Sequence, residues 1–293
     1  MPFFSVVLIT YNRADLLPRC IDSVINQTFK DWELIIVDNH SEDGSKELIE
    51  GYMARDSRIR FRQVHNNNVL AVSRNEGIRM ANGEYICTLD SDDWYTENKL
   101  QTVYDVCCKT PYDVIYSKFQ LMSAKGAGDV HGASLTWDDT FMELLVNGNS
   151  ICNMTTVIKK KAWEDVGLLS EDPQLSAVED IDGLLNLSYT KHSFHFIDEV
   201  LGYYWVGDNM SHSPKQIERA KTLFEKWIVK VEDEKKREMA RGGRYFLYGR
   251  LYHGLGDWKN ARANYKMVLL NKYSLKKKEA VVLYVMALLK IKR

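Results

Sequence analysis

The chain has 293 residues, of which 45% are hydrophobic and 27% are charged, as in an ordinary folded protein. This length suffices for one large domain with an appendage, or for two domains. The five cysteines are odd in number and none follows a C-x-x-C spacing, which argues against a disulfide framework or a thiolate zinc site and favours a reducing compartment.

The N-terminus, MPFFSVVLIT, has no basic segment and no cleavage site, and no run reaches the ~18 apolar residues that span a bilayer. We therefore expect a cytosolic protein. The net charge of −1 conceals a division: residues 1–214 carry 18 basic and 32 acidic side chains, a net of −14, and residues 215–293 carry 21 and 8, a net of +13. Such a split predicts two units with different surroundings.

The first ninety residues alternate short apolar runs with segments of helical spacing. The order strand–helix–strand predicts a doubly wound, mostly parallel sheet, the α/β class. The third strand alternates in polarity and is expected near an edge. Strands are predicted at 5–10, 33–38, 59–64 and 84–90, and helices at 16–25, 45–53 and 70–81.

Beyond Lys99 the pattern is looser, and from Pro214 onward the spacing is helical. The domain prediction is one domain over 1–213, with two halves (1–94 and 95–213), followed by a basic helical region (214–293). Within 95–213 we predict strands at 113–122, 151–160 and 194–206, a Gly-rich loop at 124–134 and a helix at 179–187.

Polar side chains follow three of the predicted strands where each one ends. Thr10-Tyr11-Asn12 follow the first strand, Asp38 the second, and Asp90-Ser91-Asp92-Asp93 the fourth. Ligands of doubly wound sheets bind at the carboxyl ends of the strands. The sequence therefore predicts a polar, acidic site at this edge.

The three clustered carboxylates repel one another unless a cation neutralises them, so they either form a solvated turn or hold a metal. The chain has no G-x-G-x-x-G after the first strand, no P-loop and no G-x-S-x-G. Without a glycine-rich phosphate loop, a bound diphosphate needs a metal, and a D-x-D cluster offers the hard oxygens that Mg²⁺ or Mn²⁺ prefers.

Four motifs resemble glycosyltransferase family 2, a family of inverting enzymes with the GT-A fold that use nucleotide-diphospho-sugars. The resemblance covers about residues 3–213, and the order and spacing of the motifs make it specific. It implies that 1–213 is a catalytic domain with a nucleotide-binding half (1–94) and an acceptor half (95–213). The matching segments are TYNR (10–13), IIVDNHSEDGS (35–45), SRNEGIRMANGEYICTLDSDDW (73–94) and VEDIDGLLNL (178–187).

The resemblance implies roles for individual side chains. Asp38 is expected to accept the N3–H of uracil, Asp92 and Asp90 to ligate Mn²⁺ or Mg²⁺ with His212 as a further ligand, and Trp94 to offer a sugar-stacking face. The nucleotide-sugar is expected to contact Thr10, Tyr11, Asn12, Arg13, Asp38, Arg74, Asp90, Ser91, Asp93 and Trp94.

Glu179 and Asp180 match the family's Glu-Asp pair, and Asp180 is our choice of general base, with Glu179 as the alternative. The chain departs from the family where Asn39 replaces an acid after the second strand and where Val206 replaces a common arginine. Contacts of the diphosphate with the C-terminal loop are therefore in doubt.

The C-terminal region contains two further patterns. Residues 245–270 resemble one tetratricopeptide-like helical hairpin. Residues 274–293 hold an apolar run, 280–289, between lysine clusters, which suits peripheral contact with an anionic membrane or a solvated basic helix that closes the domain. The basic residues lack interleaved aromatics, so we expect no nucleic acid as partner. The oligomeric state stays open.

The resulting hypothesis is a metal-dependent inverting glycosyltransferase that moves a hexose or N-acetylhexosamine from a UDP-sugar to a glycan or a lipid-linked glycan in bacterial surface polysaccharide synthesis. We expect it in the cytoplasm, either free or peripherally at the inner face of the cytoplasmic membrane. The first alternative is a catalytically silent GT-A scaffold protein. The second is a sugar-1-phosphate nucleotidyltransferase, which the absence of a glycine-rich basic loop after the first strand disfavours.

Overall fold

The computed structural model describes residues 1–148, 150–207 and 214–292. The chain forms two compact units, and each is interrupted in sequence. The first comprises Met1–Ser134, Ser150–Pro173 and Asn186–Asp208, and the second comprises Leu135–Asn149, Gln174–Leu185 and Asn209–Arg293. The division of function between 1–213 and 214–293 remains a prediction.

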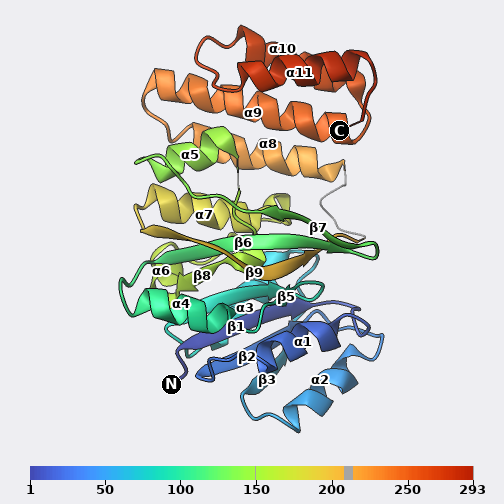
Figure 1. Ribbon diagram of the computed structural model, residues 1–293, viewed down its shortest axis with the longest axis vertical. Helices are drawn as coiled ribbons and strands as arrows, with labels where there is room; N and C mark the ends of the chain where they lie inside the picture. The colour runs from blue at the N-terminus through green and yellow to red at the C-terminus, as the bar shows by residue number, and fades with distance from the viewer. Residues whose placement is uncertain (149, 208–213, 293) are drawn as a thin grey trace. The chain divides into compact units, whose positions relative to one another are not determined.

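The first unit is built on one curled sheet, in which the described residues form nine strands in the order β3-β2-β1-β4-β8-β6-β9-β5, with β7 paired to β6 (Figure 1). The β1–β2, β1–β4, β2–β3 and β6–β9 pairs are parallel. The strands are β1 Phe4–Thr10, β2 Trp32–Asp38, β3 Ile59–Gln63, β4 Tyr85–Asp90, β5 Trp94–Tyr95, β6 Val114–Ser123, β7 Gly126–His131, β8 Val157–Lys159 and β9 Phe194–Trp205.

Helices cover both faces of the parallel half of this sheet, which explains why β1 and β2 are buried along their whole length. Phe4 and Leu8 share a core with Leu17 and Ile21 of α1. On the other face, a Cβ on Gly77 of α3 would lie 2.3 Å from Val7, so the glycine permits close packing of helix on strand. The helices are α1 Leu17–Ile25, α2 Ser45–Met53, α3 Leu70–Met80, α4 Lys99–Cys107 and α6 Lys160–Asp165.

The second unit is helical among its described residues. α8, α9, α10 and α11 follow one another as neighbouring layers (Figure 1), and Trp227 of α8 packs edge-on against Phe141 of α5 at 5.8 Å between ring centroids. The helices are α5 Thr140–Asn147, α7 Glu179–Tyr189 (whose last residues belong to the first unit), α8 Lys215–Ile228, α9 Glu234–Gly254, α10 Trp258–Leu270 and α11 Lys277–Leu288. No helix of the described chain combines the length and the apolar character required to cross a membrane.

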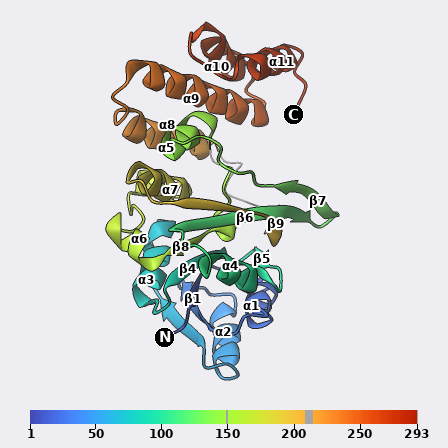
Figure 2. The same cartoon turned by 60° about the vertical axis from the view of Figure 1, so that its left-hand side comes forward.

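The predicted fold class is confirmed, and the structure corrects two element predictions. The expected loop at 124–134 contains β7, which pairs antiparallel with β6 to form a hairpin (Figure 2). All residues of β7 are exposed, so the strand lacks the alternation in polarity by which strands are recognised.

The expected strand at 151–160 is a strand only over Val157–Lys159. Its first part is a 3₁₀ turn, η1 Asn153–Thr155, because the hydroxyls of Thr155 and Thr156 donate to the carbonyls of Cys152 and Asn153 at 2.7 Å. A second such turn, η2, covers Pro173–Leu175.

Candidate functional site

The sheet register brings together the polar residues that the sequence places after β1, β2 and β4. Thr10 lies opposite Asp38 between β1 and β2, and Ile9 lies opposite Asp90 between β1 and β4. Three carboxyl ends of parallel strands thus meet at one edge. The expected acidic edge is present.

Asp38 anchors the loop that follows β2. Its side chain is fully buried, and its carboxylate accepts hydrogen bonds from the Ser41 amide at 3.0 Å, the Ser41 hydroxyl, and Gln63 Nε2 at 3.0 Å. It does not cap α2, whose N-cap is Gly44. Gln63 escaped the motif comparison, because it reaches Asp38 only through the β2–β3 register.

The loop after β1 is tied to the loop after β2. The Asn12 amide donates to Ser41 Oγ at 2.8 Å, and Asn12 Oδ1 accepts from the Glu42 amide at 2.8 Å. Tyr11, beside them, is 55% exposed, and the buried Thr10 Oγ1 has no hydrogen-bond partner among the described residues. A ring open to solvent and an unsatisfied hydroxyl are suited to contact a ligand.

Asp90 is neutralised within the protein. Arg74 of α3, which is buried, donates to Asp90 Oδ1 at 2.7 Å, and Asn153 Nδ2 donates to Asp90 Oδ2 at 3.3 Å. Asn153 is itself held by Thr88, whose hydroxyl donates to Asn153 Oδ1 at 3.0 Å. No sequence signal pointed to Asn153, which reaches the site because β8 pairs with β4.

Asp92 and Asp93 lie in a poorly solvated place. Burial and the neighbouring Asp90 raise the pKa of Asp92, and nearby Arg13 and Arg19 lower it only in part. Burial, with Asp92 and Asp90, raises the pKa of Asp93 well above its usual range, although Asp93 Oδ1 accepts from the Trp205 amide at 2.9 Å. A cation bound at this turn would therefore stabilise the ionised form of both carboxylates.

Arg19 of α1 braces this turn. Its guanidinium lies 3.7 Å from the Trp94 ring centroid and 4.7 Å from that of Trp205, and its Nη2 donates to the Asp92 carbonyl at 2.8 Å. Burial lowers the pKa of Arg19. The spacing of apolar residues along α1 gave no sign that Arg19 differs from an ordinary surface arginine.

Trp94 is half-buried and is already in contact with other side chains. Besides Arg19, its ring stacks on Tyr203 at 5.3 Å between centroids, across the β5–β9 pair. The expected sugar contact of Trp94 stays a prediction. In the described structure its indole supports the aspartate turn.

The carboxylates of the aspartate turn are chemically suited to bind Mg²⁺ or Mn²⁺. Asp90 and Asp92 provide hard oxygen ligands, and the raised pKa of Asp92 indicates uncompensated negative charge. Within the described part of the chain, no three potential ligands are grouped for a metal, and His212 lies outside the described residues. The two carboxylates fit a cation that takes its other ligands from a bound diphosphate.

The predicted general base opens α7, in the second unit. Glu179 is 1% exposed and Asp180 is half-buried. Asp182, in the same first turn of α7, accepts hydrogen bonds from Lys226 Nζ and from Trp227 Nε1, both at 2.7 Å. Asp182 therefore joins α7 to α8, and of the three acids Asp180 is the one with solvent access.

A curled, mostly parallel sheet with a D-x-D turn at its carboxyl edge is typical of GT-A nucleotide-sugar enzymes. The model of the family described as Glycosyl transferase family 2 matches residues 5–159, more than half of the chain, and the chain belongs to this family. The predicted family is thereby confirmed. Three of the four motifs lie within the matched residues, and the motif at 178–187 lies outside them.

Two curated relatives are bacterial. The chain is 29% identical over 227 residues to the putative teichuronic acid biosynthesis glycosyltransferase TuaG of Bacillus subtilis, covering 76% of this chain and 86% of TuaG. It is 40% identical over 120 residues to the poly(ribitol-phosphate) β-N-acetylglucosaminyltransferase TarP of Staphylococcus aureus, covering 39% of this chain and only 36% of TarP.

Two solved structures share the fold. TarS 1–349 of S. aureus, in complex with UDP-GlcNAc, has a TM-score of 0.71 at 18% identity, covering 99% of this chain and 88% of that one. The mannosyltransferase PcManGT of Pyrobaculum calidifontis, in complex with GDP-Man and Mn²⁺, has a TM-score of 0.63 at 15% identity, covering 99% and 87%. These similarities confirm the GT-A type of sheet.

Proposed function

We propose that this family 2 glycosyltransferase is a metal-dependent, inverting enzyme that moves a hexose or N-acetylhexosamine from a UDP-sugar to a glycan of the bacterial surface. The observation that carries the proposal is the aspartate turn at the shared carboxyl edge of β1, β2 and β4, with its raised pKa values. The names of TuaG and of the TarS complex support the polysaccharide product and the UDP-sugar donor.

The nucleoside end of the donor would lie on the loops after β1 and β2. Tyr11 offers an exposed ring for the base, and Thr10 Oγ1 offers a buried hydroxyl without a partner. Because Asp38 is fully buried, it can accept the N3–H of uracil only if the base displaces Gln63 from its carboxylate. Gln63 is thus proposed to occupy the place of the base in the ligand-free chain.

The diphosphate end would lie at the aspartate turn. Asp90 and Asp92 would hold Mg²⁺ or Mn²⁺, which when bound stabilises negative charge on the leaving diphosphate. Arg74 has a second task in this scheme. It neutralises Asp90 in the ligand-free chain and becomes available to a phosphate oxygen once Asp90 has another cationic partner.

Proton removal is assigned to Asp180. A general base takes the proton of the acceptor hydroxyl while that oxygen attacks C1 opposite the departing UDP, which inverts the configuration. Asp180 has the solvent access that an acceptor requires, whereas Glu179 is buried. Asp182 is excluded from this role by its bonds to Lys226 and Trp227.

The place of action is proposed to be the cytoplasmic side of the membrane. The odd number of cysteines and the absence of a C-x-x-C spacing favour a reducing compartment. A lipid-linked glycan presented at that face would be the acceptor.

The alternative is a catalytically silent member that serves as a scaffold. Calorimetry of UDP binding separates the two, performed with Mn²⁺, with EDTA, and on Asp92→Asn. We expect tight binding only with metal and Asp92 present, and unchanged binding for the control Asp129→Asn, which alters an exposed acid of β7. Equal affinity in EDTA would remove the metal from the mechanism, and absence of nucleotide binding would support the scaffold.

A further inference from the structure

The helix α11 is apolar around nearly its whole circumference, although it is the last layer of the α9–α10–α11 stack. One side is buried against α10. Ala280, Leu283 and Ala287 join a cluster with Ala261 and Tyr265, and the two alanines, with no exposed surface, allow the helices to approach closely. Through this side, α11 packs onto the rest of the second unit.

Among the described residues, no element covers the other side of α11. Spacings of three and four residues place its side chains on one face, and their exposed fractions range from 46% to 66%. We call this the outer face of α11; it consists of Val281, Val282, Val285, Leu288 and Leu289. A soluble surface rarely gathers five such side chains on one helix without a partner.

Lysines border the outer face at both ends. Lys276, Lys277 and Lys278 precede it, Lys290 and Lys292 follow it, and Glu279 is the only acid between 272 and 292. No ion pair within the described ranges engages these five lysines. The combination is an apolar strip with a positive border.

We propose that the outer face of α11 lies in the interface of an anionic membrane, with its valines and leucines between the headgroups and acyl chains and its lysines on anionic lipid phosphates. Charge complementarity favours this occupant over a second copy of the chain, because residues 215–293 carry a net charge of +13 and two lysine-bordered faces would repel each other. The proposal goes beyond sugar transfer and does not depend on it.

Co-sedimentation of the full chain with vesicles tests the proposal. Vesicles of phosphatidylcholine containing phosphatidylglycerol should bind the protein about tenfold more tightly than phosphatidylcholine alone. The double substitution Val285→Glu/Leu288→Glu should abolish binding to both. The matched control is Val229→Glu, which introduces a charge at another apolar side chain of the second unit, 69% exposed.

A second pair of variants isolates the charge. Replacement of Lys276, Lys277 and Lys278 by Glu should remove the preference for phosphatidylglycerol, whereas the same change at the exposed Lys46, Lys109 and Lys125 of the first unit should leave it. UDP binding, measured on every variant, should not change, so a failure of the donor site and a failure of the membrane face are distinguished. Vesicle binding that survives Val285→Glu/Leu288→Glu would overturn the proposal, as would a wild-type dimer, seen by light scattering, that this variant dissociates.

Discussion

The carboxyl edge of the first unit and the outer face of α11 depart from the usual distribution of side chains in opposite directions. At the edge, charged groups are buried: Arg74 is 5% exposed and Asp93 is 1% exposed. On α11, apolar groups are exposed, Leu289 by 66%. Burial of charge and exposure of apolar surface both cost free energy in the isolated protein. Each departure therefore indicates a binding partner. Buried charge at the carboxyl edge indicates a charged ligand, and exposed apolar side chains on α11 indicate an apolar surface.

The largest effect is expected for Asp180→Asn. If Asp180 removes the acceptor proton, turnover should fall by about 10³-fold, because an amide cannot take up a proton. UDP affinity should stay at the wild-type value, since the donor residues are untouched. Steady-state transfer and calorimetry on the same preparation check both values.

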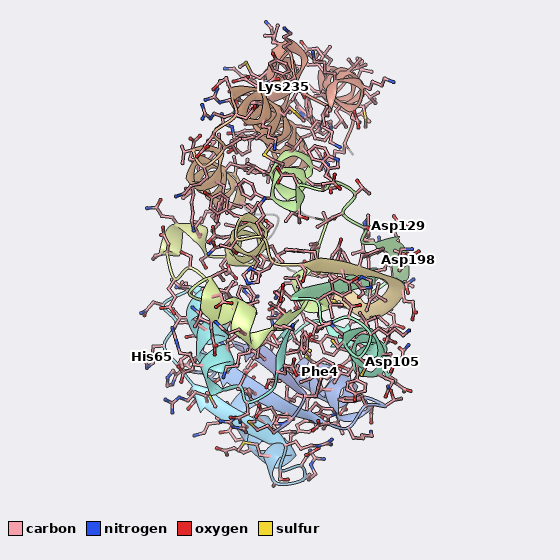
Figure 3. All side chains as sticks on the ribbon, turned by 90° about the vertical axis from the view of Figure 1, so that its left-hand side faces the viewer. Phe4, His65, Asp105, Asp129, Asp198 and Lys235 are labelled. Carbon is pink, nitrogen blue, oxygen red and sulfur yellow. The ribbon has the colours of Figure 1, made fainter. Side chains whose placement is uncertain are left out.

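The control for this variant is Asp198→Asn, on β9. Asp198 and Asp129 both lie at the surface on one side of the first unit, whereas Phe4 lies in its interior (Figure 3). Full turnover is expected for Asp198→Asn. Wild-type turnover for Asp180→Asn and a large loss for Glu179→Gln would transfer the role to Glu179.

The second prediction concerns stability. Asp182→Ala removes the carboxylate that accepts hydrogen bonds from Lys226 Nζ and from the buried Trp227 Nε1. The free energy of unfolding should fall by about 2 kcal/mol, a value that allows for the partial exposure of Lys226. Urea unfolding measures it. An exposed acid, Asp129→Ala, should change stability by less than about 0.5 kcal/mol.

The third prediction tests whether Arg19 acts on the aspartate turn. Arg19→Met keeps much of the packing between Trp94 and Trp205 but loses the positive charge and the bond to the Asp92 carbonyl. UDP binding in Mn²⁺ should weaken about tenfold, because a turn without its brace holds the cation less well. Binding in EDTA should hardly change.

The matched control for Arg19 is Arg58→Met. Arg58 lies 3.6 Å over the Trp32 ring, a similar cation–π pair outside the aspartate turn. Both variants lose a stacked guanidinium, and only Arg19→Met should lose metal-dependent affinity. Equal losses would mean that Arg19 serves stability alone.

The smallest effect is that of pH. Because burial and Asp90 raise the pKa of Asp92, protons compete with the cation at a higher pH than for an ordinary carboxylate. Mn²⁺-supported UDP affinity should therefore fall several-fold as the pH decreases from 7, before exposed carboxylates titrate. UDP binding in EDTA should not show this dependence.

The same shift has the opposite sign for folding. A carboxylate whose pKa is raised in the folded state opposes folding when it is ionised, so mild acidification should not lower the free energy of unfolding of the metal-free protein through Asp92 and Asp93. Unfolding midpoints between pH 7 and pH 6 check the sign. A parallel loss of stability and of UDP affinity would contradict the assignment of the pH effect to the turn.

Most of the first unit could be predicted from the sequence because its elements are strongly patterned. The continuous apolar runs of β1 and β2 indicate strands covered on both faces, and the structure has them so. The strand β7 was not predicted because all its residues are exposed and their polarity does not alternate. The prediction of a strand at the start of 151–160 was wrong because the threonine hydroxyls there donate to backbone carbonyls and form a 3₁₀ turn.

Local sequence patterns are enough to predict the helix and strand order of residues 1–94 and the family motifs, including the acids that follow β2 and β4. Hydrophobic periodicity and short motifs are properties of neighbouring residues. It is the folded chain that brings Gln63 to Asp38, Asn153 and Arg74 to Asp90, and Arg19 to the rings of Trp94 and Trp205. These contacts join segments far apart in the chain, through strand register and helix packing that no local pattern encodes. The sequence of α11 is apolar on both sides, and packing against α10 buries one of these sides and leaves the other exposed.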